Sequence, residues 1–240
     1  MTAQICPRTE LTAGDVASMF QLFESYYDGT SFEIFREDLA NKLDVILLRS
    51  VDGQLHGFST LTVISYDDRG EKGRAIFSGD TIIRHNHWGT QALPLAFASY
   101  AAAVKAELPD QPLYWFLISK GHRTYRYLPL LFHDYYPRHD MATPPSTQRL
   151  MNLLATMKFG EHYDPWSGLV RFPVSRGQLR GDWAGVPAPA LRKPEVRFFL
   201  DRNPGYAAGQ ELVCLAELTA SNLRSVGRRR FEDTLEVSHS

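Results

Sequence analysis

The residues with the clearest chemical potential lie around two apolar segments, 75–84 and 113–119. Asp80 interrupts the first segment between Gly79 and Thr81, although acidic residues are unfavourable inside a strand. A carboxylate there costs stability unless it is paired or lines a cleft. Asp80 is therefore a candidate functional residue at a cleft. A structural ion pair is the alternative.

A second polar group follows the segment 113–119, in the sequence SKGHRTYRY. Its basic side chains are Lys120, His122, Arg123 and Arg126. The carboxyl end of a strand is where α/β proteins place their ligand sites. His122 titrates near neutral pH and is therefore a candidate acid or base, with a packed or surface histidine as the alternative.

A strand, a helix and a second strand must position these side chains. The segment 75–84 predicts the first strand. A helix from residue 90 or 91 to about 107 follows, because apolar residues recur at steps of three and four. Pro94 must lie in its first turn, where a missing N–H does no harm. The uninterrupted apolar segment 113–119 predicts a central strand that is covered on both faces.

Further elements are expected on either side of this unit. Before it, the predicted elements are helices at about 12–27 and from Ser31, then strands at 45–50 and 55–66. After it, they are a short helix across 125–136, a helix at about 146–157, and strands at 168–174, 196–200 and 211–218. The tail from Ser225 is polar, and we expect it to be a solvated end.

The bulk composition limits the classes of function. With 240 residues, of which 44% are hydrophobic and 22% charged, the chain is typical of a globular protein. A net charge of −1 provides no field to attract nucleic acid, so no nucleic-acid partner is predicted. The sequence shows no signal peptide and no apolar stretch of transmembrane length. Two cysteines suit a reducing compartment, and we expect a cytoplasmic location.

Several other chemistries lack their motifs. His85 and His87 form an H-x-H pair without an evident third ligand, so no metal site is predicted. The sequence holds no G-x-S-x-G elbow, no G-x-x-x-x-G-K-[ST] phosphate loop and no G-x-G-x-x-G after a strand. These absences argue against a serine hydrolase and against the common nucleotide-binding enzymes.

The order of the predicted elements resembles that of the GCN5-related N-acetyltransferase (GNAT) superfamily, the acyl-CoA N-acyltransferase fold. Over about residues 12–138 the order is helix, helix, antiparallel hairpin, third strand, helix, fourth strand, helix. The resemblance implies an α/β (α+β) fold with a mixed central sheet flanked by helices. We expect one GNAT-like domain over 1–240, in which about 139–240 form a C-terminal, strand-rich elaboration.

The resemblance also implies an activity, the transfer of an acyl group from a thioester to an amine of a small-molecule acceptor. Asp80 would be the base on the third strand. Tyr127, which we favour over Tyr125, would give a proton to the leaving thiolate, with simple packing as the alternative for either tyrosine. His122 would be a further acid or base.

The same resemblance implies where the donor binds. The backbone of Ile82, Ile83 and Arg84 would pair with the pantetheine arm of the donor. The pyrophosphate would meet the N-terminus of the following helix, where free N–H groups and the helix dipole favour an anion. The loop residues at that N-terminus are Trp88, Gly89, Thr90 and Gln91.

The turn RHNHWGTQA departs from the phosphate-binding pattern of the family. It offers the single glycine Gly89, and the bulky Trp88 stands where a small residue is usual. The donor could therefore be a longer acyl-CoA or an acyl carrier protein thioester. One alternative is a plain turn without phosphate, in a catalytically inactive ligand- or partner-binding module. Another is a related fold with different chemistry, and a homodimer is also compatible with the sequence.

Overall fold

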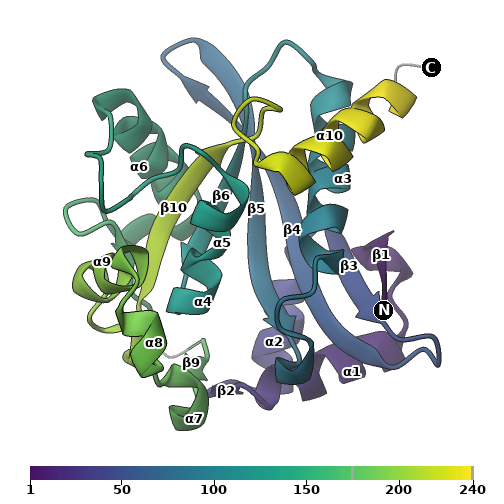
Figure 1. The fold of residues 1–240 in the computed structure, drawn as a ribbon. Helices are drawn as coiled ribbons and strands as arrows, with labels where there is room; N and C mark the ends of the chain where they lie inside the picture. Colours follow the sequence, from purple (N-terminus) through teal and green to yellow (C-terminus); the bar gives the residue numbers. More distant parts are fainter. Residues whose placement is uncertain (174–175, 239–240) are drawn as a thin grey trace.

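An eight-stranded mixed sheet forms the centre of the computed structural model, which describes residues 1–173 and 176–238 (Figure 1). Its strands, in chain order, are β1 (Thr2–Pro7), β3 (Asp44–Arg49), β4 (Leu55–Asp68), β5 (Glu71–Ile83), β6 (Leu113–Ser119), β7 (Tyr163–Asp164), β8 (Leu169–Val170) and β10 (Glu211–Glu217). Across the sheet they follow the order β1–β3–β4–β5–β6–β10–β8–β7. A separate two-stranded ribbon joins β2 (Tyr27–Asp28) to β9 (Gln178–Leu179).

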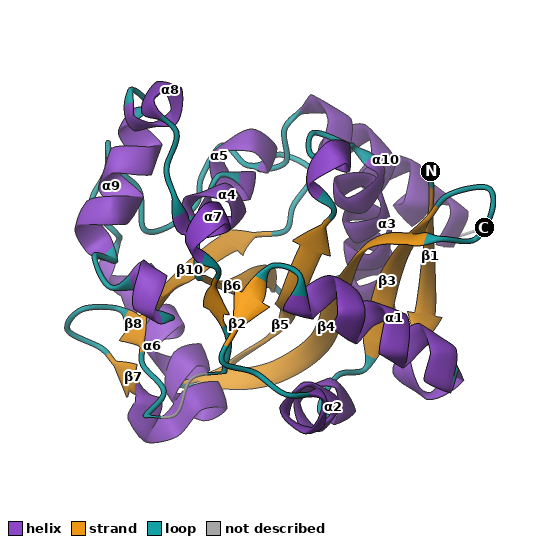
Figure 2. Cartoon of the chain, turned by 90° about the horizontal axis from the view of Figure 1, so that it is seen from below, coloured by secondary structure: helices purple, strands orange, loops and turns teal. Residues whose placement is uncertain are grey.

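Helices cover both faces of the sheet (Figure 1 and Figure 2). One face carries α3 (Ala92–Glu107), α4 (His122–Tyr125), α5 (Tyr127–Leu131), α9 (Pro194–Arg202) and α10 (Ser225–Ser238). The opposite face carries α1 (Ala13–Glu24), α2 (Phe32–Ala40) and α6 (Pro145–Phe159). The short helices α7 (Gly181–Ala184) and α8 (Ala188–Leu191) lie between β9 and α9. Single 3-10 turns are η1 (Arg8–Glu10), η2 (His85–His87), η3 (Gly160–His162) and η4 (Tyr206–Ala208).

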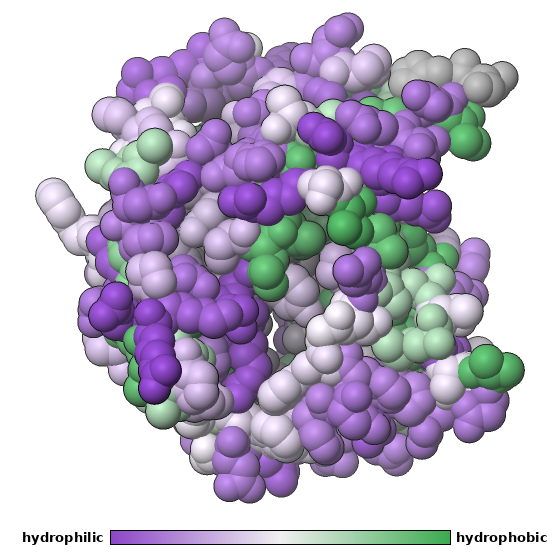
Figure 3. All heavy atoms as spheres, viewed as in Figure 1, coloured by the Kyte–Doolittle hydropathy of each residue, from purple (hydrophilic) through white to green (hydrophobic). Residues whose placement is uncertain are grey.

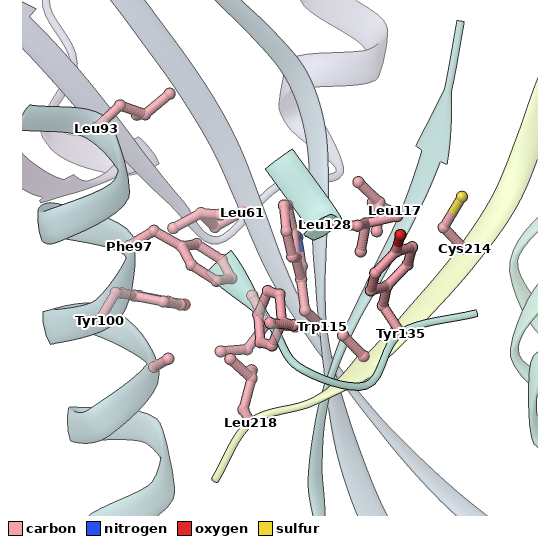
Figure 4. Packing of buried hydrophobic residues seen from close by; sticks show 14 of the residues in the cluster. Leu61, Leu93, Phe97, Tyr100, Trp115, Leu117, Leu128, Tyr135, Cys214 and Leu218 are labelled. Atoms are coloured by element: carbon pink, nitrogen blue, oxygen red, sulfur yellow. The ribbon is translucent and has the colours of Figure 1, made fainter. Parts of the chain in front are cut away.

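Alternation along the strands divides the core between the two faces. On β6, Trp115 and Leu117 pack toward α3, whereas Phe116 packs toward α6. Figure 4 shows the first of these layers, in which the ring of Phe97 on α3 lies 5.0 Å from that of Trp115. Both faces of this strand are buried, as its uninterrupted apolar sequence predicted.

The parallel pair β5–β6 separates before either strand ends. The two strands are paired as far as Ser78 and Leu117. Beyond that point β5 continues along β4 to Ile83, while β6 continues along β10 to Ser119. The separation leaves an opening between the carboxyl-terminal ends of two neighbouring strands, where α/β proteins place their ligands.

The predicted fold class is confirmed, since the chain forms a mixed central sheet with helices on both faces. The prediction that about 139–240 are rich in strands is wrong, because this part consists mainly of the helices α6 to α10. Both parts of the chain, 12–138 and 139–240, contribute strands to the one large sheet. The predicted strands at 45–50, 55–66, 75–84, 113–119 and 211–218 correspond to β3, β4, β5, β6 and β10.

Two further predictions for the C-terminal part are wrong. The segment 196–200 is helical and belongs to α9, because Pro194 begins the helix and the buried residues Val196 and Phe199 are three apart. The tail from Ser225 is not a solvated end but the helix α10, which lies along α3 in Figure 1. Its anchor is Phe231, which is only 2% exposed.

Smaller differences concern three other segments. The helix predicted across 125–136 is split into α4 and α5 and ends at Leu131. The strand predicted at 168–174 is limited to β8, and residue 174 lies outside the described residues. The strand β1 at the N-terminus was not predicted; it pairs with β3 at the edge of the sheet.

Candidate functional site

A cavity of about 760 Å³ lies at the opening between β5 and β6, on the face covered by α1, α2 and α6. Its volume falls in the range of sites for small molecules. Phenylalanine rings from α1, α2, β5 and α6 supply apolar wall. Charged residues that line the cavity are Glu37, Asp38, Lys42, Asp80, Lys120, Lys158, Arg176 and Glu211. The site therefore combines apolar walls with charges of both signs.

A β-bulge in β5 aims Asp80 into this cavity. The β4–β5 register shifts between Ser59 and Leu61 on β4. Gly79 and Asp80 of β5 therefore lie together opposite the single residue Thr60 of β4. A bulge of this kind leaves a residue unpaired and redirects its side chain. Both Gly79 and Asp80 line the cavity.

Because Gly79 has no side chain, the end of the Lys42 side chain can lie close to the backbone beside Asp80. A Cβ at this position would lie 2.6 Å from Thr60 Oγ1 and 3.0 Å from Lys42 Nζ. Atoms at these distances would have to move, so a larger residue would displace Lys42 from the cavity wall.

Asp80 lies between two ion pairs. Lys42 Nζ is 2.5 Å from Asp38 Oδ2, and Lys120 Nζ is 3.4 Å from Glu211 Oε1. Each lysine is thus partly neutralised by its own acid. Within the described residues, Asp80 itself makes no hydrogen bond and no ion pair.

The pKa of Asp80 reflects this position. Burial raises the pKa of Asp80 from 3.8 to about 6. The neighbouring Asp38 and Glu211 add to the rise, while Lys42 and Lys120 oppose it. A carboxyl group with this pKa is largely ionised at neutral pH and is a stronger base than an exposed aspartate.

A third lysine of the cavity has no acidic partner. Lys158, in the last turn of α6, makes no hydrogen bond or ion pair with the described residues. Its Nζ lies 4.3 Å from the centroid of the Phe77 ring, a cation–π contact. Burial lowers the pKa of Lys158 to about 8, and Lys42 adds to the lowering.

The residues predicted to pair with a donor arm differ in where their backbone points. Arg84 N–H donates to His56 O on β4. Because directions alternate along an antiparallel strand, Ile82 also faces β4, and Ile83 faces the open edge of β5. The Ile83 carbonyl already accepts a hydrogen bond of 2.8 Å from the Trp88 indole.

The predicted phosphate loop is a compact turn that leads into α3. Gly89 has a φ of +91°, a left-handed conformation that glycine adopts readily. Thr90 Oγ1 accepts a hydrogen bond of 3.3 Å from the N–H of Ala92. Gln91 precedes the helix, and its side chain makes no capping hydrogen bond. The turn therefore needs its glycine whether or not a phosphate binds.

An aromatic cluster from the C-terminal part of the chain covers this turn. The Trp183 ring on α7 lies 5.6 Å from that of Trp88 and 5.4 Å from that of His85. Arg123 stacks 4.5 Å from the Trp88 ring and donates a hydrogen bond of 2.7 Å to the Trp183 carbonyl. The side chains of Trp88, Trp183 and Arg123, called the aromatic cover below, thus lie at the open edge of β5.

The predicted catalytic residues are not gathered in one cavity. Asp80 lines the cavity, whereas His122 and Tyr127 do not. Burial lowers the pKa of His122 to about 4, which keeps the imidazole neutral at pH 7. Tyr127 packs against the core on the α3 face of the sheet, and burial raises its pKa. Tyr125 is fully buried, and its hydroxyl donates a hydrogen bond of 2.8 Å to Pro137 O.

Several residues of the site were missed in the sequence, among them Glu211, Lys42, Lys158 and Trp183. Glu211 carried a usable signal, because it is an acid at the start of an apolar strand, as Asp80 is within one. Lys42 and Lys158 carried none, since a lysine near a helix C-terminus is ordinary. Trp183 lies far along the chain from the turn that it covers.

The described residues were also compared with the requirements of a metal site, a membrane span and a disulfide. In residues 1–173 and 176–238, no group of three or more His, Cys, Asp or Glu side chains could hold a metal ion. No helix in the same residues is both long and apolar enough to cross a membrane. Cys6 and Cys214 are both buried and form no disulfide. Figure 3 views the α3 face, where hydrophobic residues gather between α5 and α3 and hydrophilic residues cover most of the rest.

Comparisons with known proteins find similar folds only among solved structures. No protein-family model and no curated protein sequence matches the chain. A conserved Enterococcus faecalis protein of unknown function, described as a probable N-acyltransferase, shares 15% identity over 53% of this chain and 32% of its own, with a TM-score of 0.39. The match therefore spans about a third of that protein's length.

Two further solved structures are similar over about half of this chain. The Arabidopsis thaliana protein NAA60, solved with a bisubstrate analogue, shares 13% identity over 58% of this chain and 89% of its own, at a TM-score of 0.39. The Escherichia coli GNAT family N-acetyltransferase YhbS, solved with CoA, shares 14% identity over 50% and 64%, at a TM-score of 0.34.

Proposed function

We propose that this protein is an acyltransferase that moves an acyl group from a thioester donor to an amine of a small-molecule acceptor. The observation that carries the proposal is the carboxyl group of Asp80. It forms no ion pair with the described residues, it lines a cavity of about 760 Å³, and its pKa is raised to about 6. It lies where β5 and β6 separate, so the acceptor would occupy the cavity beside it.

The chemistry assigns each residue one step. Asp80 takes a proton from the acceptor ammonium, and the freed amine nitrogen attacks the thioester carbonyl. A C–N bond forms, the C–S bond breaks and the sulfur leaves as a thiolate, while the nitrogen releases its second proton to become the amide. Tyr127, in α5 beyond the end of β6, would give its proton to the thiolate, and the proton released by the nitrogen would restore the tyrosine. His122 is neutral, and it would assist only as an acceptor or donor of hydrogen bonds.

The donor would lie along the open edge of β5. Ile83 presents its backbone there, and the N-terminus of α3 is the nearest helix terminus for an anionic group. The aromatic cover occupies this edge, so the donor must displace or stack on it. Acyl-CoA and an acyl carrier protein thioester are both compatible with this geometry.

Steady-state kinetics of Asp80→Asn test the proposal. With acetyl-CoA and a long-chain acyl-CoA as donors and a panel of amines as acceptors, release of the free thiol measures turnover. We expect kcat to fall by about a hundredfold or more, because general base catalysis contributes about that much. Donor affinity should stay within twofold. Full turnover by the variant would remove Asp80 from the mechanism.

A non-catalytic binding module is the second candidate, and the aromatic cover favours it. The Ile83 carbonyl is already bonded to Trp88, and Trp183 lies over that ring. Thermal unfolding with CoA, acetyl-CoA and a long acyl-CoA distinguishes the two functions. A donor at a hundred times its Kd should add about 2.7 kcal/mol of stability. Absence of any shift would favour the binding module over a CoA-dependent enzyme.

A further inference from the structure

A smaller recess of about 120 Å³ lies next to the cavity beside Asp80. Lys120, Phe172 and Arg176 line both spaces, so the two are immediate neighbours. Arg171 and residues 208–210 complete its wall. Three of the described residues that line this recess are cationic and none is acidic. We call this space the basic recess.

The three cations of the basic recess differ in what they already bind. Lys120 is paired with Glu211, and Arg171 Nη1 is 3.2 Å from Asp164 Oδ2. Arg176 stacks 4.6 Å from the centroid of the Phe172 ring and forms no ion pair within the described residues. Its guanidinium is therefore available to an anionic group.

Charges of opposite sign without an ion-pair partner among the described residues thus lie in two neighbouring spaces. Asp80 is such an acid in the cavity, and Arg176 is such a cation at the recess. Lys158 adds a second unpartnered cation to the cavity wall. A ligand that carries both charges would satisfy both ends, whereas a polycationic amine would leave the cations unpaired and repelled.

We propose that the acceptor is an amine that also carries a carboxylate or phosphate on an apolar body. The ammonium group would lie at Asp80, the anionic group in the basic recess at Arg176, and the apolar body against the phenylalanine rings between them. This inference rests on the proposed acyl transfer for the role of the acceptor, but the binding that it predicts needs no donor.

Three probes test the charge requirement by isothermal titration without any donor. Phenylalanine carries an amine, an apolar ring and a carboxylate, and 1-amino-2-phenylethylphosphonic acid carries a phosphonate in place of the carboxylate. Phenylethylamine has the amine and the ring but no anion. We expect at least one anionic probe to bind tenfold or more tightly than phenylethylamine, and the better of the two identifies the anion. Equal or tighter binding of phenylethylamine, or no binding of either anionic probe, would overturn the proposal.

Matched variants locate the anionic group. Arg176→Gln should remove the tenfold preference while leaving phenylethylamine affinity within twofold. Arg180→Gln is the control, since this exposed arginine pairs with Asp28 and lines neither space. It should keep the preference. If both Arg176→Gln and Lys158→Gln keep the tenfold preference for the anionic probe over phenylethylamine, the anionic group binds at neither cation and the proposal is overturned.

The experiment separates this inference from the proposed function. If phenylethylamine is acylated as well as phenylalanine in the thiol-release assay, acyl transfer stands and the anionic requirement falls. If phenylalanine binds with the predicted preference but no amine is acylated, the anionic amine site stands and the acyltransferase falls.

Discussion

Replacing Asp80 with asparagine should stabilise the protein at neutral and alkaline pH, although it removes the proposed catalytic base. Burial raises the pKa of Asp80 from 3.8 to about 6. One pH unit corresponds to about 1.4 kcal/mol, so the ionised form costs about 3 kcal/mol in the folded protein. Asparagine has nearly the same shape and carries no charge, so the variant avoids this cost.

The sign of the effect follows from which state holds the proton more tightly. With its raised pKa, folded Asp80 binds a proton more tightly than Asp80 in the unfolded chain. Near pH 3 both states are protonated and the cost vanishes. As the pH rises through the interval from 3.8 to about 6, the unfolded chain loses its proton first and the wild-type protein loses stability. The advantage of Asp80→Asn should therefore grow across this interval and level off above pH 7.

Urea unfolding of both proteins at pH 4, 5, 6 and 8 measures the difference directly. Asp38→Asn is the matched control, because it makes the same change at the same cavity but breaks an existing pair. The Lys42 side chain is only 2% exposed and would lose its partner, whereas Asp38 is 38% exposed. We expect this control to be destabilised at pH 8 by about 1–2 kcal/mol, less than a fully buried pair would lose.

An unchanged or lower stability of Asp80→Asn at pH 8 would refute the reasoning. It would mean that Lys42 and Lys120 stabilise the Asp80 carboxylate more than burial disfavours it. Asp80 would then be a member of a structural ion-pair network, the alternative that its position in the sequence left open.

Three further predictions concern neighbouring positions. Tyr125→Phe should cost about 1–2 kcal/mol in urea unfolding, because Pro137 O loses its buried partner, while turnover stays unchanged; a loss of turnover at equal stability would point to a chemical role. Gly79→Ala should cost about 1–3 kcal/mol, since the new Cβ would lie 2.6 Å from Thr60 Oγ1, and wild-type stability would contradict the close packing. Trp183→Ala should remove part of the aromatic cover and so tighten acyl-CoA binding about tenfold in isothermal titration; unchanged affinity would show that the donor does not bind at the open edge of β5.

Local patterns were sufficient for most of the elements around the site. The apolar segment 113–119 predicted a strand buried on both faces, because hydrophobic residues without alternation leave no solvent side. Pro94 fixed the start of α3 to within a turn, because its ring is tolerated only there. The segment 196–200 was mistaken for a strand, since aromatic and β-branched residues favour strands unless tertiary packing selects a helix.

The helix α10 shows a different limit. Its sequence is rich in arginine and acid, and only Phe231 and a few other apolar residues face the protein. Most of the stability of such a helix comes from packing against a partner, here α3. A partner that lies more than a hundred residues away in the chain leaves no local signal.

By itself, the sequence determined the fold class, the strand that carries Asp80 and the reason to suspect this residue. A lone acid in an apolar strand is costly, so its presence is informative in any fold. Only the tertiary structure decided that Asp80 lies between two ion pairs, that Lys158 and Arg176 form no ion pair with the described residues, and that Trp183 covers the turn before α3. Charge pairing depends on distances between residues that are remote in the chain, and no local pattern encodes those distances.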